Sequence, residues 1–277
     1  MSKLSKILVR ARRQVFSEMV GNNPSIFHGE GYDFIELREY MPGDDIRHID
    51  WNITAKMQKP YIKIFKEERE LNIVIASMLN GSVHFGAKKF KQELIAEVVA
   101  NLSYAILHNG DLLSTHIYAD RLYSENKPTK KVSSITKSVD EILRFDPINK
   151  VADYKTLGET LYKRVRRRSL ILVVADFFDL PDFKLLSKKH EVIAIIVRDR
   201  LEERPVAMGF ASLRDPESGQ QLEGDYSQKS VERYAAKVRQ HDRELYEKLR
   251  KDGVRFTKVY TDENSAIALR RLFEGRI

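Results

Sequence analysis

Residues 71–118 have the sequence LNIVIASMLNGSVHFGAKKFKQELIAEVVANLSYAILHNGDLLSTHIY, and this stretch decides the fold class. It opens with a short apolar run, Leu71–Ala76, of the kind that forms a buried parallel strand. A helix is expected over Lys88–His108, because apolar side chains recur at helical spacing and Asn109-Gly110 can end it in a left-handed conformation. Leu112–Tyr118 predicts the next strand.

The same alternation continues to the end of the chain. Met208–Glu223 interrupts it with the turn sequence Asp215-Pro216-Glu217-Ser218-Gly219 between two short extended segments, which predicts a β-hairpin. Alternating strands and helices are typical of a mostly parallel sheet with helices on both faces, so we expect an α/β fold. The expected strands are Leu170–Ala175, Glu191–Val197 and Val254–Val259, and the expected helices are Val132–Leu143, Thr156–Arg167, Tyr226–Lys251 and Asn264–Phe273.

The composition fits one large or two modest folded domains. The 277 residues are 42% hydrophobic, and they include no cysteine, which excludes disulfides, thiolate zinc sites and a cysteine nucleophile. No apolar run approaches the roughly 18 residues of a membrane span, and residues 1–20 lack the apolar centre of a signal peptide. A cytoplasmic location is therefore expected.

The net charge of +8 suits an acidic partner, whether nucleic acid, a membrane surface or an acidic protein. Positive and negative side chains are well mixed, however, so most of them are expected to be solvated surface. The basic run Lys163–Arg168 ends an expected helix, where cations interact favourably with the helix dipole. Because aromatic side chains do not interleave this run for base stacking, nucleic acid is the less favoured partner.

Residues 1–70 are predicted to form an N-terminal extension, and residues 71–277 the α/β domain. The first 20 residues predict a basic amphipathic helix, which either docks on the body of the protein or binds a membrane surface or partner. Pro60–Lys66 predicts a strand. Between them lies Gly29–Trp51, with the sequence GEGYDFIELREYMPGDDIRHIDW, here named the signature segment. It combines acids, bases and aromatics in a pattern that neither a helix nor a strand requires.

The signature segment resembles that of a bacterial family, domain of unknown function 58, whose members accompany MoxR-type AAA+ ATPases. The resemblance rests on the groups GEG, YDF, LREY, PGDD and IDW, and it covers most of the chain. It implies that residues 71–277 form a von Willebrand factor A-like (Rossmann-like) domain. It also implies a MoxR-type ATPase as partner, and it admits membrane-anchored von Willebrand A-like proteins as further partners and a peripheral position at the inner membrane.

Many relatives of that fold hold Mg²⁺ through an Asp-x-Ser-x-Ser loop after the first strand and an aspartate from a later loop. Matching the loop through residues 85–86 places Met78 at the aspartate, Asn80 and Ser82 at the serines, and Asp176 at the later aspartate. Because Mg²⁺ prefers hard oxygen ligands, the Met78 thioether cannot replace a carboxylate. We expect a degenerate site that binds Mg²⁺ weakly at best, and no other cofactor. In the competing interpretation, Asp176 caps a turn and Ser82 starts a helix.

Five residues of the signature segment are predicted to carry its function: Arg38, Asp45, Arg47, Asp50 and Trp51. Two interpretations stay open. These residues could form an ion network that fixes the extension onto the sheet, with the tryptophan as an anchor. Alternatively, the arginines and acids could contact an ATPase or its client.

The common catalytic motifs are missing from the sequence, including phosphate-binding and dinucleotide-binding glycine loops, H-E-x-x-H and G-x-S-x-G. A metal-dependent nuclease could be built from Asp50, Lys66, Glu67 and Glu68, but this run also fits a solvated strand end. We therefore expect a non-enzymatic protein-binding adaptor that works with a MoxR-type AAA+ ATPase in assembly or maturation of client proteins. The alternatives are a nucleic-acid-binding protein that uses the basic surface and a metal-dependent adhesion module.

Overall fold

The computed structural model describes residues 2–15, 17, 34–65 and 70–273, and the chain divides into two compact units. Unit 1 combines Met1–Ile26 with Asn72–Ile277, and unit 2 is Phe27–Leu71. The second boundary lies next to the predicted division at residue 70. The predicted division placed the N-terminal helix in the extension, whereas this helix belongs to the unit that contains the large sheet.

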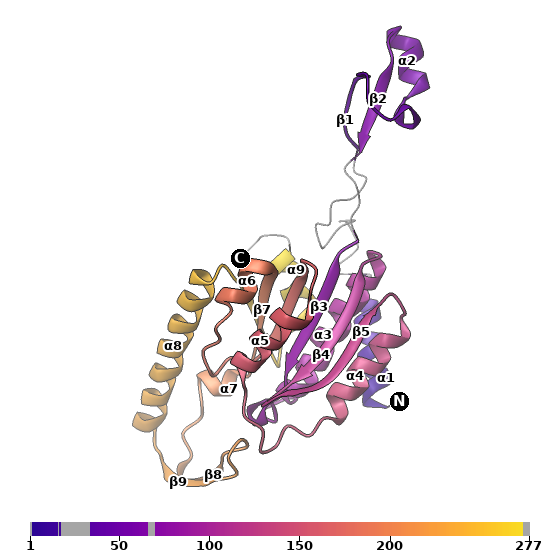
Figure 1. Ribbon diagram of the computed structural model, residues 1–277. Helices are drawn as coiled ribbons and strands as arrows, with labels where there is room; N and C mark the ends of the chain where they lie inside the picture. The colour runs from indigo at the N-terminus through magenta and orange to yellow at the C-terminus, as the bar shows by residue number, and fades with distance from the viewer. Residues whose placement is uncertain (1, 16, 18–33, 66–69, 274–277) are drawn as a thin grey trace. The chain divides into compact units, whose positions relative to one another are not determined.

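Unit 1 is built on a sheet whose strand order is β10-β7-β6-β3-β4-β5 (Figure 1). Neighbouring strands run parallel except β5, which pairs antiparallel with β4. From β3 the chain first adds β4 and β5 on one side, and then crosses to add β6, β7 and β10 on the other side. This is a doubly wound order, and its direction of winding reverses between β3 and β6. The six described strands are β3 (Asn72–Met78), β4 (Leu112–Tyr118), β5 (Leu122–Thr129), β6 (Leu170–Ala175), β7 (Glu191–Arg198) and β10 (Arg255–Tyr260).

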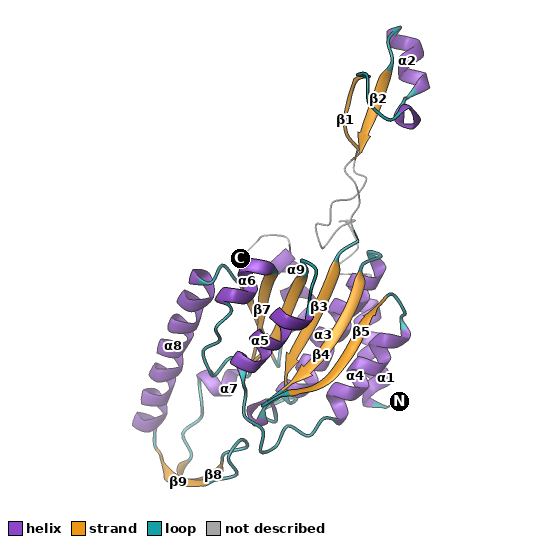
Figure 2. Ribbon diagram, in the orientation of Figure 1, coloured by secondary structure: helices purple, strands orange, loops and turns teal. Residues whose placement is uncertain are grey.

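The central strands are apolar because helices cover both faces of the sheet (Figure 2). Successive side chains of a strand point to opposite faces, and every residue of β6 is buried. One face packs against α5 (Tyr154–Arg164), α6 (Lys184–Lys189) and α8 (Gln228–Lys251). The other face is covered by α3 (Lys91–His108), which in turn contacts α1 (Lys3–Gln14), α4 (Ser133–Arg144) and α9 (Ser265–Phe273).

This architecture confirms the expected α/β fold with a mostly parallel sheet, while the finer assignment to a von Willebrand factor A-like fold stays a prediction. The expected hairpin is also confirmed as β8 (Gly209–Arg214) and β9 (Gln221–Tyr226), which pair antiparallel. The strand β5 was not predicted, because its sequence, LYSENKPT, is polar and includes a proline. Such a sequence is tolerated at the edge of a sheet, where one side of the strand needs no hydrogen-bonded neighbour.

The helix α1 packs on the body of unit 1. Its side chains Ile7 and Ala11 are buried, and Gln14 Nε2 donates a hydrogen bond to Asn264 Oδ1 at 3.0 Å. Lys3 forms an ion pair with Glu93 of α3. The basic amphipathic helix predicted from the sequence therefore docks through its apolar side.

Unit 2 contains the described part of the signature segment; Gly29–Asp33 lie outside the described residues. Strands β1 (Phe34–Glu39) and β2 (Tyr61–Phe65) pair antiparallel. The short helices η2 (Ile46–His48) and α2 (Trp51–Met57) lie between them in the chain.

Candidate functional site

Two polar loops meet at the carboxyl ends of neighbouring strands in unit 1. The loop after β3 forms the short helix η3 (Gly81–Val83), and residues 176–179 follow β6. The chain leaves these strands toward opposite faces, to α3 after β3 and to α6 after β6. This reversal point is where open α/β sheets usually bind ligands.

Asp176 lies at the centre of a buried polar cluster. Its Oδ2 accepts hydrogen bonds from the Ser82 hydroxyl and from Lys91 Nζ, the latter at 2.8 Å. Burial alone would raise the pKa of Asp176, but the charges of Lys91 and Arg198 and these hydrogen bonds outweigh it and lower the pKa. The carboxylate is therefore ionised and compensated by side chains of the same chain.

Lys91, the first residue of α3, supplies the nearest positive charge. Its side chain is fully buried, which is rare for lysine unless it is paired. Nζ lies 2.8 Å from Asp176 Oδ2 and 2.5 Å from Glu202 Oε1. Burial raises the pKa of Glu202 despite the opposing charge of Lys91. Ser82, Lys91, Asp176 and Glu202 are named the Asp176 cluster below.

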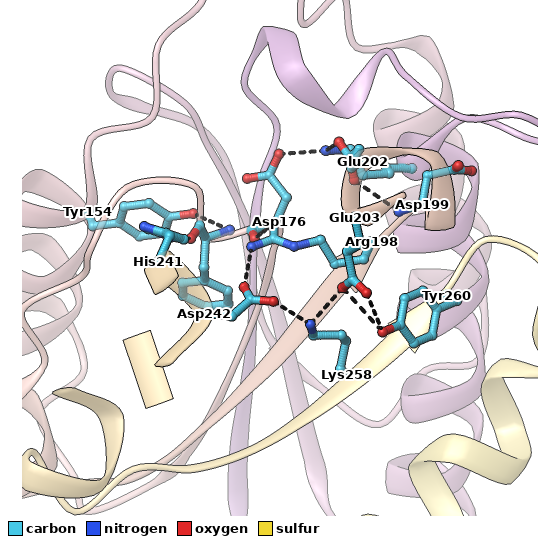
Figure 3. A network of polar contacts seen from close by, with 12 residues as sticks. Tyr154, Asp176, Arg198, Asp199, Glu202, Glu203, His241, Asp242, Lys258 and Tyr260 are labelled. Atoms are coloured by element: carbon cyan, nitrogen blue, oxygen red, sulfur yellow. Dashed lines mark hydrogen bonds and ion pairs between the residues drawn. The ribbon is translucent and has the colours of Figure 1, made fainter. Parts of the chain in front are cut away.

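Arg198 connects this cluster to a second set of charges (Figure 3). One guanidinium nitrogen donates to the backbone carbonyl of Asp176, and Nη2 donates to Asp242 Oδ1 at 3.1 Å. Lys258 Nζ lies 2.7 Å from both Asp242 Oδ2 and Glu203 Oε1. Burial opposes ionisation of Asp242, but Lys258 and Arg198 together lower its pKa. An alternating series of cations and carboxylates therefore runs along this edge of the sheet.

The turn after Asp176 is held in a strained conformation. Phe177 has φ of +52°, a left-handed value that a bulky residue rarely adopts. Its N–H donates to the Tyr154 hydroxyl at 3.1 Å, and its carbonyl accepts from His241 Nε2 at 2.8 Å (Figure 3). The Phe177 and Tyr154 rings also stack, with centroids 5.2 Å apart. These contacts fix the backbone from which the Asp176 side chain projects.

The tip of the β8–β9 hairpin lies against the loop after β3. Asn80 Nδ2 donates to Glu217 Oε1 at 2.5 Å, and the Pro216 carbonyl accepts from the Asn149 N–H at 2.9 Å. A Cβ atom on Gly81 would lie 2.4 Å from the Pro216 carbonyl oxygen, so this close approach requires glycine. Burial raises the pKa of Glu217 even though the Asn80 hydrogen bond opposes the shift. The hairpin thus closes over part of the candidate site.

The four positions matched to a metal loop do not all lie in one site. Asn80 Nδ2 donates to Ser82 Oγ at 2.8 Å, and Ser82 bonds Asp176. Met78, however, packs in the apolar core on the face covered by α5. The interpretation of Asp176 as a turn cap is wrong, because its carboxylate instead bridges Ser82 and Lys91.

These residues do not fit a divalent cation. The ammonium group of Lys91 already contacts Asp176 Oδ2, the oxygen that also accepts from Ser82, and it would repel a second cation there. Asp176 Oδ1 and Asn80 Oδ1 are buried acceptors that have no hydrogen-bond partner among the described residues. The second carboxylate of the cluster, Glu202, is held by the same ammonium group, so the charged lysine leaves Mg²⁺ no unengaged pair of carboxylates. Weak Mg²⁺ binding at these positions stays a prediction.

The signature segment forms local ion pairs within unit 2. Arg38 contacts both carboxylate oxygens of Asp44, at 2.9 and 2.7 Å, although Asp44 was not among the predicted residues. Arg47 Nη2 lies 2.6 Å from Asp45 Oδ2. Asp50 caps the N-terminus of α2, accepting hydrogen bonds from two backbone N–H groups of its first turn.

The large apolar side chains of this segment are exposed. The exposed fraction is 68% for Trp51 and 64% for Ile46, and Met41 and Met57 are also more than half exposed. The Arg47 side chain is 84% exposed. Trp51 is therefore not part of a core within its own unit, and both interpretations of the predicted residues stay predictions.

Comparison with known proteins identifies the family. Residues 36–244 match the model of a protein family of unknown function, DUF58. The chain belongs to this family. Uncharacterized proteins of Mycobacterium bovis and Mycobacterium tuberculosis are 22% identical to it, over 88% of this chain and 79% of theirs.

Two solved structures resemble this DUF58 chain weakly. BatB from Bacteroides thetaiotaomicron is 13% identical with a TM-score of 0.48, and covers 74% of this chain and 98% of its own. An aerotolerance-related membrane protein from Bacteroides fragilis is 11% identical with a TM-score of 0.47, covering 74% of this chain and 97% of its own. Within the described part of the DUF58 chain, no helix is both long and apolar enough to span a membrane.

Several charged residues of the Asp176 cluster and its neighbours were not predicted from the sequence: Lys91, Arg198, Glu202 and Asp242. Lys91 carried a detectable signal, because it lies one turn before Ile95 on the buried stripe of α3. A lysine at such a position requires a buried counter-charge. Glu202 lies in a four-residue helix, α7 (Arg200–Glu203), which has no periodicity to detect.

The described residues bear only in part on the features behind the alternative functions. In the basic run, Arg164 pairs with Glu125 at 2.6 Å and Lys163 with Glu159 at 3.4 Å, while Arg166, Arg167 and Arg168 are exposed. The nuclease candidates Lys66, Glu67 and Glu68 are outside the described residues. Neither nucleic-acid binding nor nuclease chemistry gains a specific contact from this part of the structure.

Proposed function

We propose that this DUF58 chain is a non-enzymatic adaptor with a von Willebrand factor A-like domain, which binds a MoxR-type AAA+ ATPase and presents client proteins for assembly or maturation. The ATPase supplies the energy and the adaptor supplies recognition. No metal or organic cofactor takes part. The proposed location is cytoplasmic, with the inner membrane as a peripheral site.

The observation that carries the proposal is the exposed surface of the signature segment. The side chains of Trp51 and Ile46 are exposed. The side chain of Arg47, which follows Ile46 in the sequence, is 84% exposed. Tryptophan and arginine dominate the binding energy of many protein interfaces, because they combine large contact area with directional hydrogen bonds. An adaptor needs such a surface, whereas a folded domain does not gain stability from exposing it.

The closed site of unit 1 supports the non-enzymatic part of the proposal. Asp176, Lys91 and Arg198 are fully buried; the Asp176 carboxylate pairs with Lys91, and its backbone carbonyl accepts from Arg198. The hairpin tip lies against the adjoining loop. A catalytic acid or nucleophile must instead be able to reach substrate. The doubly wound strand order supports the von Willebrand A-like assignment, which shares this Rossmann-like architecture.

The test measures binding of the purified chain to the MoxR-type ATPase of its own organism. We expect Trp51→Ala and Arg47→Ala each to weaken binding at least about 10-fold, the range typical of interface hot spots. Phe210→Ala is the matched control, because Phe210 is an aromatic residue that is 77% exposed on the hairpin of unit 1. Asp50→Ala is a poor contact probe, since Asp50 caps α2 and its loss would disturb the local fold.

Thermal unfolding of the same variants separates the two interpretations of the signature segment. If Trp51→Ala lowers the unfolding temperature but leaves ATPase affinity unchanged, the segment acts as a structural junction. If the wild-type chain does not bind the ATPase at all, the adaptor proposal is refuted.

A further inference from the structure

Lys91 holds a position that is unusual for a lysine. Its ammonium group lies between two carboxylates, Asp176 and Glu202, and its side chain has no exposed surface. Nζ also lies 4.9 Å from the centre of the Phe178 ring. The ammonium group therefore contacts two carboxylates, one from the loop after β6 and one from the helix after β7. Both lie at the edge where the sheet's winding reverses.

The surrounding backbone fixes this position. The Lys91 N–H donates to the Phe85 carbonyl at 2.8 Å, and Asp199 accepts from the Ala87 N–H at 2.9 Å. The start of α3 is thereby tied to its own preceding loop and to the end of β7. These bonds fix the backbone from which Lys91 projects, and complete burial with two carboxylate contacts holds its charged end.

A divalent cation would bind the same oxygens. It would require Asp176, whose Oδ2 already accepts from both Lys91 and the Ser82 hydroxyl. Ammonium and metal cannot share that oxygen, because two cations at contact distance repel strongly in a buried site. The two groups are alternatives.

We propose that the ammonium group of Lys91 takes the place of a divalent cation in the Asp176 cluster, and that removing it creates a binding site for Mg²⁺ or Mn²⁺. The site would use the carboxylates of Asp176 and Glu202 and the hydroxyl of Ser82. The second oxygen of the same carboxylate, Asp176 Oδ1, is buried without a hydrogen-bond partner among the described residues and can add a ligand. This inference does not depend on the adaptor function, since it concerns the free protein alone.

The first test uses the wild-type chain. Calorimetric titration with MnCl₂ after treatment with EDTA is expected to show no saturable site at micromolar affinity. Micromolar binding that disappears in Asp176→Asn would overturn the proposal, because the metal would then coexist with Lys91.

The second test uses Lys91→Met, which keeps most of the side-chain volume and removes the charge. In EDTA its unfolding temperature should fall by about 6–20 °C, as expected when one partner of a buried ion pair is lost. Saturating Mn²⁺ should restore about 5–10 °C, and should not stabilise the wild-type chain. Failure of Mn²⁺ to stabilise the folded variant beyond wild type contradicts the proposal.

Two further variants make the result specific. Lys89→Met removes a neighbouring lysine that pairs with the single carboxylate of Glu97, so it should gain no metal response. Lys91→Met combined with Asp176→Asn should lose the response gained by Lys91→Met. A metal response that persists in this double variant would place the ion elsewhere and refute the assignment.

Lys91→Gln covers the case in which Lys91→Met does not fold, because its amide can still donate hydrogen bonds to the two carboxylates. It should refold in higher yield with Mn²⁺ than with EDTA, whereas wild type should refold equally in both. Equal yields for Lys91→Gln under the two conditions would count against the proposal.

Discussion

The ion series around Asp242 makes a prediction that can be measured with a double-mutant cycle. Asp242 Oδ1 accepts from Arg198 Nη2 at 3.1 Å, and Oδ2 accepts from Lys258 Nζ at 2.7 Å. Arg198 is fully buried, and the Asp242 side chain is 11% exposed, so solvent screens this pair little. Asp242→Leu therefore leaves a buried guanidinium without its carboxylate.

The two single variants should differ in cost. Asp242→Leu should lower the free energy of unfolding by about 3–5 kcal/mol, the usual result of removing one member of a buried ion pair. Arg198→Met should cost less, about 1–3 kcal/mol, because Asp242 keeps Lys258 and Asp176 keeps Lys91. The double variant should cost no more than Asp242→Leu alone, since leucine and methionine leave no unpaired charge. The expected coupling is therefore about 1–3 kcal/mol.

Urea unfolding followed by far-ultraviolet circular dichroism provides the measurement. Tryptophan fluorescence is unsuitable, because the single tryptophan, Trp51, lies in unit 2. Arg200→Met is the control: Arg200 also contacts two carboxylates, but its side chain is 53% exposed, so the cost should stay below about 1 kcal/mol. The reasoning is refuted if the two single variants are additive within about 0.5 kcal/mol, or if Asp242→Leu costs no more than Arg200→Met.

Two further predictions concern His116 and Gly81. Burial lowers the pKa of His116 from 6.5 to about 4. Between these values the unfolded chain binds a proton that the folded chain does not. The free energy of unfolding should therefore fall by about 3 kcal/mol through this residue as the pH is lowered from 7 to 4. Urea titrations across this range should give a shallower pH dependence for His116→Gln, and an unchanged slope would refute the assignment. Gly81→Ala would bring a Cβ within 2.4 Å of the Pro216 carbonyl oxygen, so amide exchange should accelerate at the hairpin tip; Gly158→Ala, with a nearest contact of 3.5 Å, is the control. Equal exchange in Gly81→Ala and wild type would show that the tip does not depend on this contact.

The parts of the fold that the sequence predicts are those with a strong hydrophobic pattern. The buried strand β6 coincides with the predicted Leu170–Ala175, because its neighbours cover both faces and select a continuous apolar run. The start of α5 was predicted two residues late, because Asp153 caps the helix through the Thr156 N–H. The edge strand β5 was missed, since its stability comes from pairing with β4, which periodicity cannot reveal.

The candidate site was only partly predictable for a similar reason. Asp176 follows an apolar strand, and that position alone places a carboxylate at the carboxyl edge of the sheet. Its partner Lys91 is 85 residues away in the sequence, and the contact depends on how α3 packs across the sheet. Sequence spacing shows that a charge lies on a buried stripe, but it does not identify the opposite charge.

The buried faces of two helices, α3 and α8, each include one charged residue. Lys91 begins the apolar stripe of α3 on one face of the sheet, and Asp242 interrupts that of α8, which packs on the other face. Both charges meet the carboxyl edge, where Asp176 and Arg198 join them into one series. The two helix layers are thus connected at the point where a ligand-binding α/β protein has an opening. Under the proposed adaptor function, a site closed in this way serves as a rigid support and partners contact other surfaces, among which the exposed side chains of the signature segment are the best defined.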